Sequence, residues 1–122
     1  MTRLEEIRSH PIFKEINAYL FGLEWLFKYK GTLGGGGVSY EMPTLVNLTA
    51  PCSGINLDRA MYRVNLMGIN VRGVEVHIEM NAIGINEWET VFWGTCFSLA
   101  FFHDLIHGAL GIPQHKHQCI SV

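Results

Sequence analysis

Residues 59–83 read RAMYRVNLMGINVRGVEVHIEMNAI, and this stretch decides the fold. Apolar and polar side chains alternate in two runs, Arg59 to Asn70 and Arg72 to Ile83. A period of two is typical of a strand that packs one face on a core and leaves the other face polar. Residues 68–73 supply the glycines of a hairpin connection. The stretch therefore predicts two antiparallel strands joined by a turn.

The polar face of this hairpin is the first candidate site. Alternation places Arg63 and Asn65 on that face together with Glu75, His77 and Glu79. Two carboxylates that flank an imidazole favour its charged form, and all three groups can transfer protons. Glu75, His77 and Glu79 are therefore candidate catalytic residues. The alternative is a solvent-facing sheet in which Arg63 pairs with the carboxylates across the strands.

A helix is predicted upstream of the hairpin. Pro11 suits the first helical position, with Ser9 or His10 as the cap. Apolar residues then keep helical spacing as far as Phe27, and Gly31 is the predicted stop. This helix is the firmest secondary-structure prediction in the chain.

The segment between that helix and the hairpin contains a glycine run and a further strand. Residues 34–37 are four consecutive glycines, which favour a flexible turn. A phosphate-binding loop normally joins a strand to a helix and ends in Lys-Ser/Thr, whereas this run follows a predicted helix, precedes a predicted strand and lacks that lysine. Residues 38–49 have the composition of a strand, broken near Pro43.

Downstream of the hairpin, the sequence predicts a buried helix from Asn86 to about Leu110. Asn86 and Glu89 have the spacing of a capping box, and Gly111 suits the left-handed conformation that ends a helix. Because Gly94 weakens this helix, the competing interpretation is a short strand to Trp93 and a helix from Thr95. The apolar run is interrupted too often to supply the ~20 apolar residues of a membrane span.

The end of the chain carries the second candidate site. His103 and His107 are four residues apart, so both imidazoles project from the same side of a helix. His115 and His117 follow in the tail and share a face if the tail is extended. These four histidines are candidate ligands of a divalent metal, zinc or iron, with Asp104 as a proton-transfer or supporting group. The alternative is that His103 and His107 are core or interface histidines and that the tail is solvated.

Composition restricts the class of protein. The chain has 122 residues, which predicts a single domain over 1–122. It is 48% hydrophobic and 16% charged, against a usual charged fraction of about 25%. This low charge predicts a homo-oligomer, in which other subunits cover apolar surface. A net charge of −2 without a basic stripe argues against a nucleic-acid partner. With three cysteines and no signal peptide, a cytoplasmic protein without a membrane partner is expected.

The order of predicted elements defines the fold class. It is α+β, with an antiparallel sheet of three to four strands and the N-terminal and C-terminal helices packed on one face. A ferredoxin-like or profilin-like layer satisfies this order.

Three motifs of the second half suggest a family: Pro51-Cys52, Glu87-x-Glu89 and His103-Asp104-x-x-His107. In similar places, the cyclic pyranopterin monophosphate synthase family of molybdenum-cofactor biosynthesis has a Pro-x-Cys-type turn, two glutamates and a helix ending in Tyr-Asp-x-x-Lys. The second half of this chain resembles that pattern, although His107 replaces the lysine and Ser53 replaces the histidine after the cysteine. The resemblance implies a sheet-plus-helix oligomer with sites at subunit contacts.

These observations lead to one main hypothesis and one alternative. The main hypothesis is a small oligomeric enzyme that acts on a small polar molecule, either through a histidine-held divalent metal or by metal-free acid–base chemistry. Hydrolase, lyase and isomerase reactions all remain open. The alternative is a non-catalytic homo-oligomeric module that binds a small-molecule ligand or serves assembly.

Overall fold

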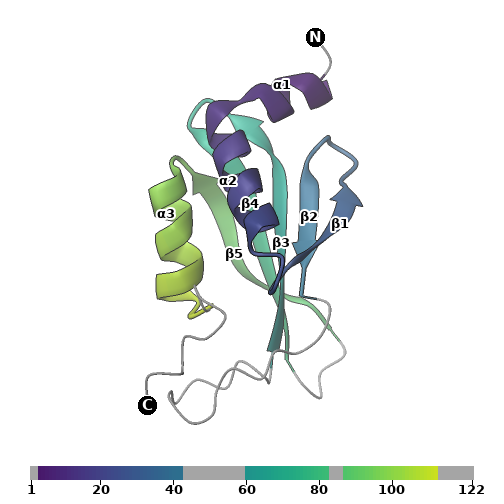
Figure 1. The fold of residues 1–122 in the computed structure, drawn as a ribbon, viewed down its shortest axis with the longest axis vertical. Helices are drawn as coiled ribbons and strands as arrows, with labels where there is room; N and C mark the ends of the chain where they lie inside the picture. The colour runs from purple at the N-terminus through teal and green to yellow at the C-terminus, as the bar shows by residue number, and fades with distance from the viewer. Residues whose placement is uncertain (1–2, 43–59, 83–86, 113–122) are drawn as a thin grey trace.

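The computed structural model describes residues 3–42, 60–82 and 87–112, which form two layers (Figure 1). One layer is a five-stranded antiparallel sheet, and the other consists of short helices on one face of it. The elements are α1 Arg3–Ser9, α2 Pro11–Gly22, β1 Lys28–Thr32, β2 Val38–Glu41, β3 Ala60–Asn70, β4 Gly73–Ala82, β5 Glu89–Cys96, α3 Leu99–His103 and the π-helical turn η2 Asp104–Ala109. The predicted α+β class is confirmed, whereas the predicted number of strands, three to four, is too low.

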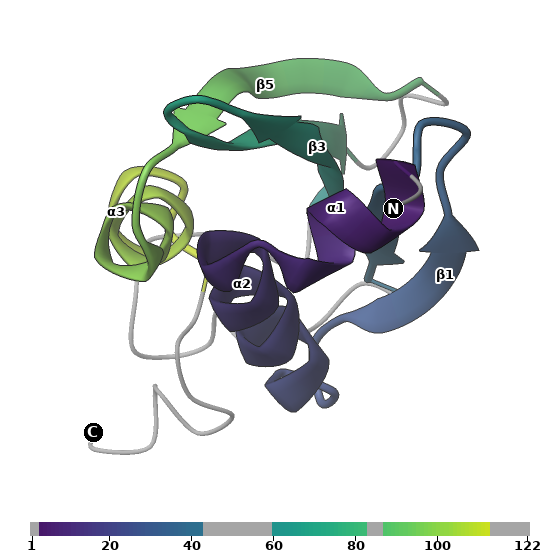
Figure 2. The same cartoon turned by 90° about the horizontal axis from the view of Figure 1, so that it is seen from above.

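The strands follow one another across the sheet in the order β1-β2-β3-β4-β5. Each neighbouring pair is antiparallel. The sheet curves around the helices, so that α1, α2 and α3 lie on its concave side (Figure 2). None of the helices in the three described ranges is long and apolar enough to cross a membrane.

The β3–β4 hairpin has the predicted pairing. Val64 lies opposite Ile78 on the core side, and Asn65 lies opposite His77 on the polar side. At the turn, the side-chain Oδ1 of Asn70 accepts hydrogen bonds from the backbone N–H groups of Arg72 and Gly73, at 2.8 and 3.2 Å. Gly73 has φ of 151°, and a Cβ there would collide with the Cys96 carbonyl, so glycine is required at this position.

The N-terminal helix begins as predicted but ends earlier. The side chain of His10 caps α2 by accepting from the Ile12 N–H at 3.3 Å, and Pro11 is the first helical residue. The predicted continuation toward Gly31 is wrong, because α2 ends at Gly22 and residues 28–32 pair with β2. The apolar spacing misleads because Leu23, Leu26 and Phe27 reach the core from a turn. Tertiary packing thus overrides the helical periodicity.

The predicted helix from Asn86 is also wrong, and the competing interpretation is closer. Residues 89–96 form β5, and the helix starts at Leu99, where the Ser98 hydroxyl caps it by accepting from the Phe101 N–H at 3.0 Å. Strand β5 is rich in β-branched and aromatic residues, which favour a strand, and it pairs with β4 from Glu89 to Cys96. Consequently Glu89 is the first residue of a strand and not part of a helix cap.

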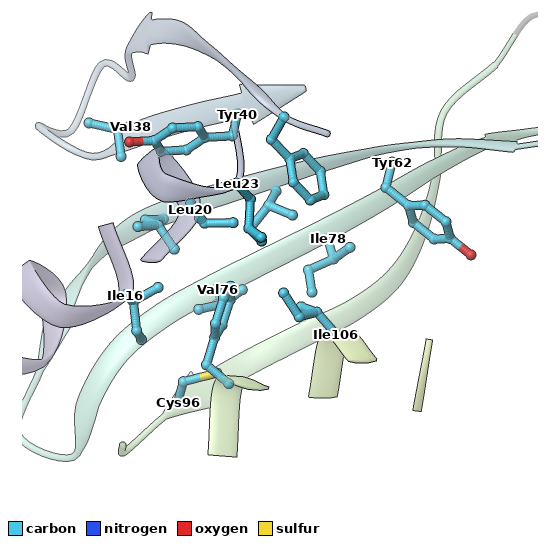
Figure 3. Close-up of a cluster of buried hydrophobic side chains, with 14 of the residues drawn as sticks. Ile16, Leu20, Leu23, Val38, Tyr40, Tyr62, Val76, Ile78, Cys96 and Ile106 are labelled. Atoms are coloured by element: carbon cyan, nitrogen blue, oxygen red, sulfur yellow. The ribbon is translucent and has the colours of Figure 1, made fainter. Parts of the chain in front are cut away.

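One hydrophobic core lies between the layers (Figure 3). Ile16 and Leu20 of α2 meet Val76 and Ile78 of β4 there, and Ile106 enters from η2. Cys96 at the end of β5 belongs to the same core, and burial raises the pKa of its thiol to about 12. The core therefore anchors the C-terminal helical segment that carries the histidines.

Candidate functional site

Tyr19, His103 and His107 come together where α2 meets the C-terminal helical segment. The ring centroids of His103 and His107 are 4.6 Å apart. Tyr19 of α2 lies against both, with centroid distances of 5.6 Å to His103 and 5.7 Å to His107. We call these three residues the helix-side cluster. All three side chains are partly buried, so their polar atoms interact in a setting of reduced water access.

The contacts of both ring nitrogens decide which tautomer a neutral His107 adopts. Its Nδ1 lies 2.7 Å from the backbone carbonyl oxygen of Ile112, and its Nε2 lies 2.6 Å from the hydroxyl of Tyr19. Because a carbonyl oxygen can only accept, Nδ1 must carry the hydrogen. In the neutral imidazole Nε2 is then the acceptor, and the Tyr19 hydroxyl donates to it. The result is a continuous chain from a phenol through an imidazole to a backbone carbonyl.

The backbone after α3 makes this arrangement possible. Residues 104–109 form a π-helical turn, and the Leu110 N–H donates to the carbonyl of Leu105 at 3.1 Å. Gly111 has φ of 74°, the left-handed conformation predicted for it, and turns the chain back. The Ile112 N–H then donates to the carbonyl of Ile106 at 2.9 Å. This reversal presents the Ile112 carbonyl to His107, and single π-helical turns frequently occur at functional sites.

The other predicted residues of this site have different positions. Asp104 is exposed, and within the described ranges it forms no hydrogen bond or ion pair with either histidine. His115 and His117 lie outside the described residues. Within those residues, no group of three or more His, Cys, Asp or Glu side chains is placed to hold a metal ion. His103 and His107 alone provide two imidazoles, which is fewer ligands than a zinc site uses.

The Glu75, His77 and Glu79 row lies on the opposite, convex face of the sheet. Oε1 of Glu79 accepts from Arg63 Nε at 2.8 Å and from Asn65 Nδ2 at 3.0 Å. The hydrogen bond from Arg63 is the main cause that lowers the pKa of Glu79. The cross-strand Arg63–carboxylate pair is thus present, as the alternative interpretation predicts.

The two other members of that row have separate partners. His77 Nε2 lies 2.8 Å from the Thr90 hydroxyl, and its ring packs against Trp93 in a tilted arrangement, with centroids 4.3 Å apart and an interplanar angle of 44°. Glu75 accepts a long hydrogen bond of 3.4 Å from Asn70. The described contacts therefore do not join the three groups into one hydrogen-bonded catalytic set.

The sequence reasoning missed Tyr19, because its place on the apolar stripe of a helix indicated only a core residue. It also missed the aromatic neighbours on the convex face, Trp88 and Trp93, since both fell within a predicted helix. No sequence signal identifies Tyr19, whereas the strand composition of residues 89–96 could have placed Trp93 beside His77.

The fold and the site together define an α+β protein with an antiparallel sheet and a tyrosine–histidine pair on the helical side of that sheet. Comparison with protein-family models, with curated proteins and with solved structures gives no match.

Proposed function

We propose that the protein is a small homo-oligomeric enzyme that acts on a small polar molecule, with Tyr19 and His107 as its acid–base pair. The hydrogen-bonded chain from Tyr19 through His107 to the Ile112 carbonyl carries this proposal. A phenol that donates to a fixed imidazole keeps its oxygen lone pairs available to accept a proton from a substrate. The geometry thus suits proton abstraction.

The proposed proton transfer can be written atom by atom. The Tyr19 oxygen accepts a proton from the substrate while its own proton moves to Nε2 of His107. His107 becomes an imidazolium whose Nδ1–H remains bonded to the Ile112 carbonyl. Burial raises the pKa of Tyr19 and so disfavours a free tyrosinate, which favours moving both protons together. Isomerase, lyase and hydrolase reactions can all begin with such a step.

A divalent metal, zinc or iron, at the same site is the second candidate. His103 and His107 are close enough to approach one ion, and His107 donates its Nδ1–H to a carbonyl, as metal-binding histidines commonly do. His115 and His117 would supply the further ligands. The ion would take the Nε2 position that the Tyr19 hydroxyl occupies. Metal analysis after purification without a histidine tag distinguishes the metal site from the metal-free acid–base pair. Only the metal site requires stoichiometric metal that a chelator removes.

Self-association is part of the proposal. Large apolar side chains are exposed on the helical side and just beyond β5 in the described residues: Phe21 (67%) and Phe97 (59%). Such exposure, in a chain with only 16% charged residues, supports contacts between subunits. Light scattering at micromolar concentration should report an oligomer, and a monodisperse monomer would contradict the proposed self-association. A cytoplasmic location is proposed with it, supported by the buried free thiol of Cys96.

Deuterium incorporation tests the enzyme proposal even while the substrate is unidentified. The protein is incubated in heavy water with a mixture of small polar metabolites, and mass spectrometry detects compounds that gain deuterium or change composition. Tyr19→Phe and His107→Asn should each reduce the rate of the affected compound by about 10²–10⁴-fold. Tyr29→Phe is the matched control, because Tyr29 lies exposed on β1 and contacts neither histidine.

The outcomes separate the hypotheses. Exchange that survives both substitutions would reject Tyr19 and His107 as the acid–base pair. No exchange or conversion by the unaltered protein would favour the alternative, a non-catalytic homo-oligomeric module that binds a small-molecule ligand or serves assembly.

A further inference from the structure

A second potential site lies on the convex face of the sheet, away from the helix-side cluster. Pairing between strands aligns two rows of side chains across this face. Ser39, Asn65, His77 and Trp93 form one row. Glu41, Arg63, Glu79 and Thr90 form the next row. Four strands thus contribute adjacent polar groups to one surface.

A hollow of about 290 Å³ opens between these rows. Arg63, Asn65, His77 and Glu79 are among its lining residues, together with the apolar side chains of Leu33 and Met67. Leu33 comes from the β1–β2 loop, which can approach β3 closely only because position 37 is glycine: a Cβ there would collide with the Leu66 carbonyl. The glycine run thereby allows the apolar side chain of Leu33 to lie beside the polar side chains of the strands.

The floor of the hollow is held rigidly by its own hydrogen bonds. The Ser39 hydroxyl donates to Asn65 Oδ1 at 2.7 Å, and Asn65 donates in turn to Glu79. Asn65 is only 6% exposed and Ser39 only 8%, although both lie on the face opposite the core. Such buried, satisfied polar groups orient the remaining atoms in advance of binding.

Several polar atoms remain available at the hollow. Among the described residues, Oε2 of Glu79, Nδ1 of His77 and Nη2 of Arg63 have no hydrogen-bond partner. These atoms comprise a carboxylate acceptor, an imidazole nitrogen and a guanidinium donor. A ligand that both donates and accepts hydrogen bonds would match this set.

The charges of the hollow are already paired within the protein. The guanidinium of Arg63 lies 2.8 Å from Glu79 and 3.7 Å from Glu41. It also lies 4.1 Å from the ring centroid of Trp88, so the place of a cation over that ring is taken. An anion would meet two carboxylates, and a cation would compete with Arg63. A neutral ligand is therefore favoured over either.

An aromatic side chain lies beside the hollow without lining it. Trp93 is 61% exposed, and its ring packs against the lining residue His77 at an interplanar angle of 44°. An exposed indole offers a flat apolar surface on which the C–H face of a sugar-like ring can pack. We propose that the convex face binds a neutral polyhydroxylated small molecule, with hydroxyl groups on Glu79, His77 and Arg63 and the carbon face on Trp93. This binding does not depend on the acid–base role of Tyr19 and His107.

Nuclear magnetic resonance of the full chain labelled with nitrogen-15 tests this site. The neutral probes are D-glucose, D-ribose and myo-inositol, and inorganic phosphate and ethylenediamine serve as charged comparators. At least one neutral probe should cause saturable shifts of the indole N–H signals of Trp88 and Trp93, in the millimolar range typical of small ligands. The signal of Trp25, which follows α2 in the helical layer, should stay unchanged.

Substitutions show whether the shifts arise in the hollow. Glu79→Gln keeps the size of the side chain and should weaken binding about tenfold, since a charge-assisted bond to the ligand is lost. Trp93→Ala should weaken it several-fold. Matched controls are Glu75→Gln, on the same face of β4 but outside the hollow, and Phe97→Ala, an exposed aromatic residue just beyond β5. The amide spectrum of each variant reports whether it is folded.

Three results would overturn the proposal: no saturable shift with any neutral probe, larger shifts with phosphate or ethylenediamine, or equal binding by folded Glu79→Gln and its control.

Discussion

His107 and His77 lie on opposite faces of the same sheet, and the contrast between them shows how partners decide what a histidine can do. His107 is partly buried, and its two ring nitrogens contact a phenol and a backbone carbonyl. His77 contacts a threonine hydroxyl and packs at a tilt against an exposed indole. The first arrangement fixes one tautomer and suits proton transfer, whereas the second leaves a nitrogen available for recognition. Residue type alone would not separate these roles.

The two regions also differ in what supports them. The helix-side cluster is carried by α2, α3 and η2, whose apolar residues are anchored in the core. The convex face instead depends on cross-strand hydrogen bonds around Glu79. We therefore expect core substitutions to affect the first region most, and polar substitutions on β4 to affect the second.

The largest expected effect is that of Phe102→Ala. Phe102 of α3 is fully buried beside His103, so its truncation should lower the free energy of unfolding by about 3–5 kcal/mol. Phe97→Ala, which removes an aromatic ring that is 59% exposed, should cost less than about 1 kcal/mol. Urea denaturation measures both. Equal costs would show that α3 is not anchored as described.

Glu79→Ala should have the next largest effect. It removes the shared acceptor of Arg63 and Asn65, and we expect a loss of about 1–3 kcal/mol because both donors lose their partner. Glu75→Ala on the same strand removes only a long hydrogen bond and should cost within about 0.5 kcal/mol. A Glu79 variant as stable as its Glu75 counterpart would mean that the convex network does not support the sheet.

Stability should also depend on pH through Glu79. The pKa of Glu79 is lowered in the folded protein, chiefly by the hydrogen bond from Arg63, from a reference value of 4.5. When the pKa of a carboxyl group is lower in the folded than in the unfolded protein, its ionised form stabilises the fold. This stabilisation is fully present at pH values above the pKa in the unfolded protein, and it is lost as the pH falls through the pKa in the folded protein. The stability difference between the unaltered protein and Glu79→Gln should therefore begin to shrink as the pH approaches 4.5 from above, and it should shrink further below that pH. A difference that grows on acidification would contradict this sign.

Tyr19→Phe should have the smallest effect on stability. It removes one hydroxyl that donates to His107, which is worth about 0.5–1.5 kcal/mol for a partly buried hydrogen bond. Tyr29→Phe removes an exposed hydroxyl next to Thr32 and should be close to neutral. If both substitutions cost the same in thermal denaturation, the Tyr19–His107 bond contributes no stability.

The sequence predicts the central strands of the sheet better than its outer strands. The β3–β4 hairpin, its polar face and an ion pair between Arg63 and a carboxylate of that face follow from alternation alone, because strand geometry fixes which side chains share a face. The outer strands β1 and β5 could not be predicted in the same way. Residues 28–31 and 89–96 fall within predicted helices, yet pairing with neighbouring strands determines their structure.

The candidate sites depend on contacts between distant parts of the chain. The spacing of His103 and His107 correctly predicts that their rings are close. It cannot predict that Tyr19, 88 residues before His107, donates to one of them. Nor can it reveal the π-helical turn and chain reversal that bring the Ile112 carbonyl to the other ring nitrogen. Both features arise only once α2 and the C-terminal helical segment pack on the core.

The protonation of His107 can be read directly from long-range correlations between the imidazole hydrogens and nitrogen-15 at neutral pH. A His107→Asn variant identifies the signals. The Tyr19–His107–Ile112 chain predicts a neutral ring with hydrogen on Nδ1 and an unprotonated, hydrogen-bonded Nε2. A ring with hydrogen on Nε2 and none on Nδ1 would break the bond to the Ile112 carbonyl and contradict the proposed acid–base pair.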